Sequence, residues 1–269
     1  MKGWLVYNEE GAARNSWFIS RLVACFFEQG IDLRLKIVTG EEENFSNVPD
    51  FALVRTIAPK LNARLERLGV VTLNNGLTAS VANDKYATYE TAKKLEIPVL
   101  PTWLYGAQEK EKLPFPLVLK TVDGHGGEEV SWVKSRRALP VFSDGRKRIL
   151  QQPSDILGKD MRAYVVGGEI VACVLREAKN DFRSNYTLGG KITPVEPTSA
   201  QREIVKKLYE YLKFDYVGID FLPTANGWVL NEIEDAAGAR MLYACTQVDI
   251  AERLAVYVKE KLTNAGKDS

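Results

Sequence analysis

Hydrophobic and polar positions follow two different periods along the first eighty residues. Residues 16–29 place Phe18, Leu22, Cys25 and Phe26 at helical spacing, and Gly30 then ends the pattern. Short apolar runs on either side of this segment have the length of buried strands. We expect strands at 3–7, 33–38, 51–56 and 70–73, and a second helix at 61–68. Strands that alternate with helices favour a parallel sheet, so this part of the chain predicts an α/β domain.

Beyond Pro101 the pattern changes to short strands joined by tight turns. Gly167-Gly168 and Asn226-Gly227 each lie between two apolar segments, which is the pattern of a β-hairpin. We expect strands at 117–122, 130–133, 163–166, 169–175, 216–222 and 228–234, and helices at 83–95, 199–214 and 249–262. The chain therefore predicts α/β material followed by α+β material rich in antiparallel hairpins.

The last predicted hairpin carries three acidic residues on one face. Side chains of a strand alternate between faces, so Glu232 and Glu234 point the same way, roughly 6.6–7 Å apart. Asp220, on the preceding strand, points away from that strand's apolar side. A three-residue loop at 225–227 would pair Thr224 with Trp228 and place Asp220 directly opposite Glu232. In the same register Trp228 and Leu230 accompany the acids, whereas Asn231 faces the core.

Facing carboxylates about 5 Å apart repel each other, so three of them require solvent, a raised pKa or cations. A solvated outer face would explain two acids. Three acids in this register favour a divalent metal site formed by Asp220, Glu232 and Glu234.

The composition narrows the chemistry. The chain has 269 residues, with 36 Lys and Arg against 35 Asp and Glu, and a net charge of +1. Such a balance gives no global field for nucleic acid or an anionic membrane, so we expect neither partner. Three scattered cysteines and one histidine exclude a disulfide framework and a cysteine zinc site. A metal would therefore be held by carboxylates, which suit Mg, Ca or Mn. No apolar run is long enough for a signal peptide or a membrane span, so we expect a cytoplasmic protein.

Three further segments have both a functional and a plain interpretation. Gly124-His125-Gly126-Gly127 lies between two strands and matches neither a P-loop nor a Rossmann motif. Such a loop can fold over phosphates and donate backbone N–H groups, or it can be a simple flexible turn. Lys85 and Lys120 can be exposed lysines or phosphate ligands. The polar loop at 178–191 is long for a connection, and long loops are often functional.

Several motifs occur together in one order. They are Asn83-Asp84-Lys85, then Asp160-Met161-Arg162, Arg176 with Asp181-Phe182-Arg183-Ser184-Asn185, Val217-Gly218-Ile219-Asp220 and Asn231-Glu232-Ile233-Glu234. In this order and spacing the chain resembles the ATP-grasp superfamily, and within it the RimK-like carboxylate–amine ligases. The resemblance implies an ATP-grasp fold with an N-terminal pre-ATP-grasp α/β domain at residues 1–82. A lid subdomain with a glycine-rich flap would span 83–158, and a C-terminal subdomain with the metal site would span 159–269.

The resemblance also implies roles for individual residues. Two Mg²⁺ ions, or Mn²⁺ in their place, would be held by Asp220, Glu232 and Glu234. Arg176, Arg183 and Asn185 would act in catalysis. ATP would be bound by Lys85, Lys120, Gly124, His125, Gly126, Gly127, Gln152, Asp160, Arg183, Ser184 and Asn185. The chain departs from the family at Glu234, where Asn is usual, at Pro153 in the adenine hinge, and at Ala236-Ala237, where Ser-Pro is usual. Pro153 has no N–H to offer a base.

The family's reaction joins a carboxylate to an amine. ATP phosphorylates the carboxylate, and the amine then displaces phosphate from the acyl phosphate to leave an amide. We expect small-molecule substrates, an amino acid or a peptide. The protein can be a homo-oligomer. Candidate substrate ligands are Arg55, Asn74 and Arg240, together with Arg14 and Asn75, and each has an alternative as a surface or capping residue. A small-molecule kinase of the same fold, or a nucleotide-binding regulatory protein with little turnover, are the alternative functions.

Overall fold

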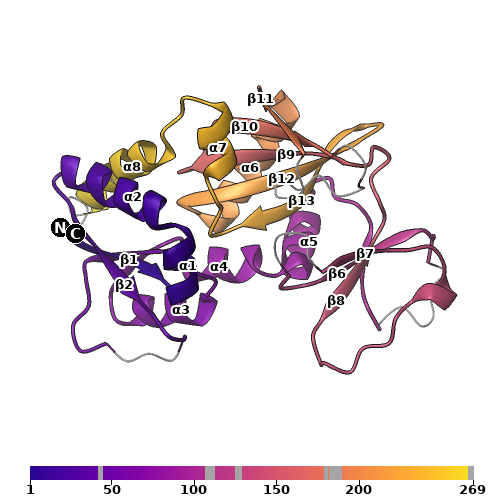
Figure 1. Ribbon diagram of the computed structural model, residues 1–269, viewed down its shortest axis with the longest axis horizontal. Helices are drawn as coiled ribbons and strands as arrows, with labels where there is room; N and C mark the ends of the chain where they lie inside the picture. Colours follow the sequence, from indigo (N-terminus) through magenta and orange to yellow (C-terminus); the bar gives the residue numbers. More distant parts are fainter. Residues whose placement is uncertain (42–44, 107–112, 125–128, 179–180, 182–189, 266–269) are drawn as a thin grey trace.

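The computed structural model describes residues 1–41, 45–106, 113–124, 129–178, 181 and 190–265. Helices and strands are both abundant, and the strands form three sheets that follow one another along the chain (Figure 1). The expected flap residues His125, Gly126 and Gly127 and the expected active-site residues Arg183, Ser184 and Asn185 lie outside the described residues. No helix in the described part of the chain is both long and apolar enough to cross a membrane.

The first sheet is parallel, as the alternating pattern predicted. Its order is β2 (Asp32–Ile37), β1 (Lys2–Tyr7), β3 (Phe51–Val54) and β4 (Val71–Leu73). The predicted helices are present as α2 (Ser16–Glu28) and α3 (Pro59–Arg67). Two further helices were not predicted, α1 (Glu9–Arg14) and α4 (Gly76–Ala82). Both are short, and α1 buries no side chain, so it carries no helical hydrophobic pattern.

The second sheet, which we call the lid sheet, is antiparallel. Its order is β5 (Thr102–Leu104), β8 (Arg148–Gln151), β6 (Leu117–Thr121) and β7 (Val130–Val133), and a single 3₁₀ turn, η1 (Arg136–Ala138), follows β7. Leu117, Leu119, Val133 and Leu150 form its small core. The strands β5 and β8 were missed by the sequence analysis because each has only three or four residues and half of β8 is polar.

The third and central sheet has five antiparallel strands. Its order is β11 (Lys191–Val195), β10 (Glu169–Glu177), β9 (Lys159–Val166), β12 (Tyr216–Thr224) and β13 (Gly227–Glu234). Helices α5 (Lys85–Lys94) and α6 (Ser199–Leu212) pack on one face, where Ala92 and Leu208 meet Ile219. Helices α2, α7 (Arg240–Cys245) and α8 (Ile250–Ala265) pack on the other face, in a core shared with the first sheet.

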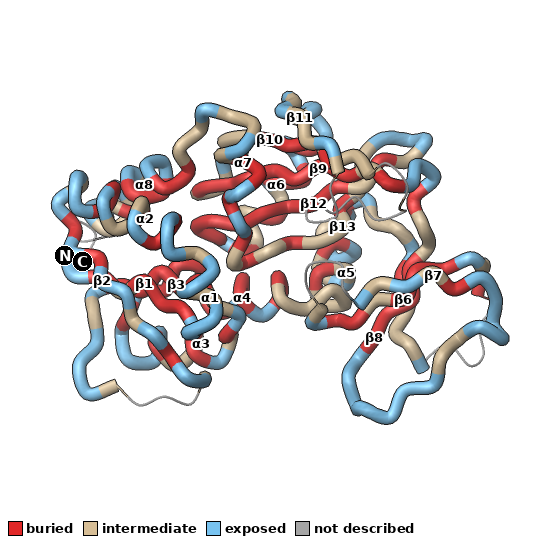
Figure 2. Tube along the Cα trace, in the orientation of Figure 1, coloured by how far each residue is buried: buried red, intermediate tan, exposed pale blue. Residues whose placement is uncertain are grey.

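On the face covered by α2, α7 and α8, the side chains of the central sheet change from apolar to charged along the strands. Tyr164 on β9, Val174 on β10 and Tyr216 on β12 are buried in the core beneath α2 and α8. Figure 2 shows that most of β9 and β12 is buried. Because side chains two residues apart share a face, the next positions along these strands are Arg162, Arg176 and, after Gly218, Asp220. The apolar core of this face therefore gives way to charged side chains at one end. The expected subdomain boundaries at residues 82 and 158 stay a prediction.

Candidate active site

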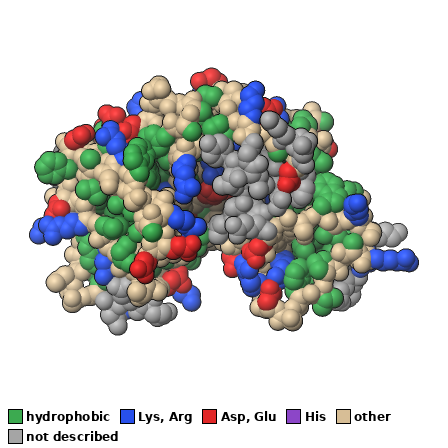
Figure 3. Space-filling model, in the orientation of Figure 1, with side chains coloured by type: hydrophobic (Ala, Val, Ile, Leu, Met, Phe, Trp, Pro, Cys, Tyr) green, Lys and Arg blue, Asp and Glu red, His purple; other side chains and the backbone are tan. Residues whose placement is uncertain are grey.

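A cleft lies between the lid sheet and the charged end of the central sheet. Lys120 and Gln151 line it from the lid sheet, whereas Asp220, Asn231 and Glu232 line it from the central sheet. Acidic and basic side chains gather around a recess near the middle of the molecule in the space-filling view (Figure 3). The cleft thus brings together residues that are more than a hundred positions apart in the sequence.

The predicted pairing of Asp220 with Glu232 is confirmed, although the strands reach it by another route. Thr224 pairs with Gly227 rather than with Trp228, so the turn has two residues, and a β-bulge at Asn231 restores the register. The bulge turns Asn231 into the cleft, where its Oδ1 accepts a hydrogen bond from Lys120 Nζ at 3.0 Å. The expectation that Asn231 faces the core was therefore wrong.

The same bulge corrects the expected neighbours of the acids. Leu230 is buried in the core beside Ile233, and Trp228 packs against that core. Both had been expected on the acidic face, because an unbroken alternation along β13 would place them there.

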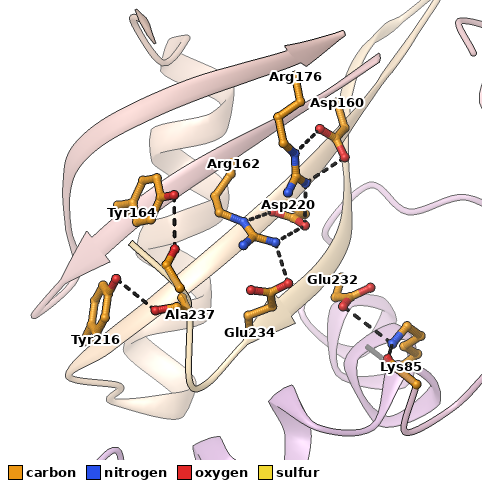
Figure 4. A network of polar contacts seen from close by, with 12 residues as sticks. Lys85, Asp160, Arg162, Tyr164, Arg176, Tyr216, Asp220, Glu232, Glu234 and Ala237 are labelled. Atoms are coloured by element: carbon orange, nitrogen blue, oxygen red, sulfur yellow. Dashed lines mark hydrogen bonds and ion pairs between the residues drawn. The ribbon is translucent and has the colours of Figure 1, made fainter. Parts of the chain in front are cut away.

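Five charged side chains form a continuous network on the central sheet, which we call the Asp–Arg network (Figure 4). Arg176 donates from Nε and Nη2 to the two carboxylate oxygens of Asp160, at 2.5 and 2.7 Å, and from Nη2 to Asp220 Oδ2 at 2.8 Å. Arg162 donates from Nε and Nη2 to Asp220 Oδ1 and Oδ2, both at 2.7 Å, and also to Glu234 Oε1. Asp160, Arg176, Asp220, Arg162 and Glu234 therefore alternate in charge.

Gly218 lies on the same face as the network, beside Ala237 and Arg162. A β-carbon at this position would lie 2.9 Å from the Ala237 side chain and 3.5 Å from Cδ and Nε of Arg162. A larger residue would therefore clash first with Ala237, whereas the distance to Arg162 is that of an ordinary contact.

Burial and charge act in opposite directions on the acids of the network. Burial by itself would raise the pKa of Asp220, but the nearby charges of Arg162 and Arg176 outweigh it and hold that pKa far below the usual range. Burial raises the pKa of Glu234, where the charge of Arg162 is opposed by Asp220 and Glu232. Asp220 is therefore firmly ionised, and Glu234 accepts a proton more readily than Asp220 does.

Two lysines face the acids from the other side of the cleft. Lys85 is the first residue of α5, whose N-cap is Asp84, and its Nζ donates to the Gly124 carbonyl and lies 3.5 Å from Glu232 Oε1. Lys120 Nζ donates to Gln151 Oε1 at 2.7 Å as well as to Asn231. Burial, together with the charge of Lys85, lowers the pKa of Lys120 to about 8.

The remaining predicted nucleotide ligands lie around the same cleft. Gly124 and Gln152 both line it, beside Pro153. The Gln152 N–H donates to the Pro101 carbonyl at 2.9 Å, so this backbone donor is engaged within the protein. Asp160 lines the cleft as predicted, but its carboxylate holds Arg176.

Two of the three candidate substrate ligands are buried. Asn74 donates to Tyr216 O and Asp235 Oδ1 and accepts from the N–H groups of Asp215 and Tyr216, which occupies its amide group. Asn74 therefore joins β4 to β12 as a structural residue. Asn75 likewise caps α4 by accepting from Thr78 N.

Arg55 is a buried cation that lies against two aromatic rings. Its guanidinium lies 5.0 Å from the ring centre of Tyr216 and 5.7 Å from that of Phe18, and it donates a hydrogen bond to the Ala237 carbonyl. Its Nε is buried without a hydrogen-bond acceptor.

Arg240 lies at a second cavity, between α2 and α7. Trp17, Phe18 and Tyr243 line this cavity with Asn15, and the ring of Trp17 packs edge-to-face on Tyr243 with 4.8 Å between centroids. Arg14 lies elsewhere, in an exposed pair with Glu10.

Arg162 and Gln151 are cleft residues that the sequence analysis did not single out. Arg162 lies two residues after Asp160 in the same strand and in the same motif, so strand alternation could have identified it. Gln151 lies on the missed strand β8 and had no local signal.

The acids of the cleft fit a hard divalent cation by their chemistry. All candidate ligands are oxygen donors, as such cations prefer. Within the described residues no three acids, cysteines or histidines converge as a preformed metal site. Two of the acids do converge on a cationic group, since Nη2 of Arg162 donates to both Asp220 and Glu234. The position between these carboxylates therefore already accommodates positive charge.

Comparisons with known proteins agree with this geometry. The RimK-like ATP-grasp domain family matches residues 84–258. A glutamate–LysW ligase from Sulfurisphaera tokodaii is 29% identical over 231 residues, which cover 78% of this chain and 82% of that protein. A probable alpha-L-glutamate ligase from Thioalkalivibrio sulfidiphilus is 27% identical, covering 73% of this chain and 70% of that protein. Among solved structures, D-alanine–D-alanine ligase from Bacillus anthracis covers 100% of this chain and 99% of its own, with a TM-score of 0.74 and 14% identity.

Proposed function

The chain belongs to the RimK-like ATP-grasp family, a family of carboxylate–amine ligases, and from that premise we propose the reaction and the roles of its residues. The proposed reaction joins a carboxylate to an amine at the expense of ATP, through an acyl phosphate. One observation carries the proposal. Three lysines, two arginines and five acids line a single cleft, and cations and acids around one site are what phosphoryl transfer needs.

ATP and Mg²⁺ are general for ligases of this fold. We assign Lys85 and Lys120 to the binding of the ATP phosphates, because both lysines line the cleft. Glu232, Glu234 and Asp220 would hold two Mg²⁺ ions, which neutralise charge on the phosphate oxygens when they are bound. Gln152 and its neighbours would contact the base.

The arginines of the network suit the negative charge that develops during acyl transfer. A carboxylate oxygen of the substrate attacks the γ-phosphorus and ADP leaves. The amine nitrogen then attacks the acyl carbon, phosphate leaves and the nitrogen loses a proton. Arg176 and Arg162 present fixed guanidinium groups at the end of the sheet, where they can stabilise the oxyanion of the tetrahedral intermediate. Arg183 and Asn185, which we assigned to catalysis from the family resemblance, would act with them.

The second cavity suggests where a substrate is recognised. Arg240 can bind a carboxylate, and the exposed ring of Trp17, with the half-buried ring of Tyr243, can cover the apolar part of an amino acid or a peptide. The two relatives reported above are named for glutamate ligation, which favours an amino acid as one of the two substrates.

A phosphate-release assay against paired amino acids, short peptides and small carboxylic acids tests this proposal. We expect ADP and phosphate to form only when both a carboxylate and an amine are present. Mass spectrometry should then find a product whose mass is the sum of the two substrate masses minus one water. A stable phosphate ester would instead identify a kinase. Strong stabilisation by Mg²⁺–ATP with no ADP formation across the whole panel would identify a regulatory nucleotide-binding protein.

A further inference from the structure

The described lining of the cleft is balanced in charge. Five cationic side chains face five anionic ones: Lys85, Lys120, Lys159, Arg162 and Arg176 against Glu129, Asp160, Asp220, Glu232 and Glu234. The acids that would hold a metal are therefore already neutralised by protein cations. A divalent cation that enters alone adds two positive charges to a balanced site.

The pairing is tightest at Asp220. Its side chain is 7% exposed, and three charge-assisted hydrogen bonds from Arg162 and Arg176 occupy its two oxygens. The Arg162 side chain is 8% exposed and binds Glu234 as well. A metal that took Asp220 and Glu234 would leave this guanidinium buried without an acceptor, and an uncompensated buried charge is strongly destabilising.

ATP removes that obstacle because it supplies new acceptors. Phosphate oxygens match the planar fork of a guanidinium and can accept its hydrogen bonds in place of a carboxylate. Each protein cation that releases an acid can then pair with a phosphate. By contrast, the ion pair of Glu232 among the described residues is with Lys85 at 3.5 Å, so its release costs less than the release of Asp220.

We propose that Arg162 is an internal counter-cation that keeps divalent metal from Asp220 and Glu234 until a nucleotide is bound. Metal and nucleotide then bind as a coupled pair, and the metal-free protein keeps its acids protected. This inference rests on the proposed function, because it assumes that the cleft takes a nucleotide with its metal. Arg162 acts here as a positioning residue, through its exchange of a carboxylate for a phosphate.

Binding of Mn²⁺ alone, followed by electron paramagnetic resonance of the free ion, tests the inference without substrate or turnover. The wild-type protein should bind Mn²⁺ weakly. Arg162→Met should bind it at least about tenfold more tightly, which is the size of a typical coupling between two sites. Adding Glu234→Gln to Arg162→Met should abolish the gain. Arg202→Met is the matched control, because Arg202 lies outside the described lining of the cleft and forms an exposed pair with Glu196 at 3.7 Å.

A second variant guards against misfolding. Arg162→Lys keeps the charge but cannot span Asp220 and Glu234 together, so it should give an intermediate Mn²⁺ affinity. Thermal unfolding identifies the variants that fold. Unchanged Mn²⁺ binding in a folded Arg162 variant would overturn the inference while leaving the proposed function intact. If the wild-type protein is stabilised by neither a non-hydrolysable ATP analogue nor its Mn²⁺ complex, the proposed function itself fails.

Discussion

Lys120 Nζ lies 3.0 Å from Asn231 Oδ1, and this hydrogen bond joins the lid sheet to the acidic end of the central sheet. The contact exists because a bulge in β13 turns Asn231 out of the core, and because Lys120 lies half-buried between the two sheets. The same ammonium group donates to Gln151 on β8. Lys120 therefore contacts both walls of the cleft, and its charge state should affect the affinity of the cleft for a nucleotide.

Nucleotide affinity should fall as the pH rises through 8. Burial lowers the pKa of Lys120 to about 8, so the group is protonated below that pH and neutral above it. If only the charged form binds phosphate, the affinity falls by up to about tenfold for each pH unit above 8. Titration of a non-hydrolysable ATP analogue between pH 6.5 and 9.5 measures this. Lys120→Arg, which stays charged throughout, should remove the step, and a step of the same size in that variant would contradict the assignment.

Glu232→Gln should lower the rate of ADP formation at least about a hundredfold. The substitution removes a carboxylate that would hold Mg²⁺ against the phosphate that is transferred. The measurement is ADP release with a substrate pair that supports turnover in the wild-type protein. Glu196→Gln is the control, since Glu196 is exposed and lies outside the cleft. Wild-type turnover in Glu232→Gln would show that the metal assignment is wrong.

Asp220→Asn should destabilise the metal-free protein by about 3 kcal/mol, because it leaves the buried guanidinium groups of Arg162 and Arg176 without their shared carboxylate. Urea unfolding without nucleotide or metal measures the free energy of unfolding. Asp32→Asn breaks an exposed pair with Arg34 and should have little effect. Equal effects of the two substitutions would mean that the Asp–Arg network does not contribute to folding.

Arg240→Gln should raise the KM for the substrate that carries the free carboxylate, by about tenfold or more, while kcat changes little. A charge-assisted hydrogen bond of the kind that Arg240 can offer contributes about 1.5–3 kcal/mol. Steady-state kinetics with each substrate varied in turn identifies which of the two is affected. Arg14→Gln serves as the matched control, because Arg14 is exposed and pairs with Glu10 outside the cavity. An unchanged KM for both substrates would remove Arg240 from the proposed substrate site.

Much of the fold could be predicted from local patterns. The period of apolar residues in α2 and α6 and the turn residues at Gly167-Gly168 are local signals, and the structure contains those helices and that hairpin. The pairing of Asp220 with Glu232 was also predicted. It holds because the shorter turn shifts the register by one residue and the bulge in β13 shifts it back. Short elements such as α1, β5 and β8 were missed, because a few residues give no measurable period.

The charged positions, and the shared face of Asp220, Glu232 and Glu234, follow from the order of the residues, because side chains alternate along a regular strand. How those charges are paired depends on long-range contacts. Arg162 and Glu234 are 72 residues apart, and Lys85 and Glu232 are still farther apart, so no local rule links them. Their contacts depend on where α2 and α8 stop covering the central sheet and on how closely the lid sheet approaches it. For this reason the acids of the predicted metal site are bound to arginines and a lysine, an arrangement that the sequence alone did not predict.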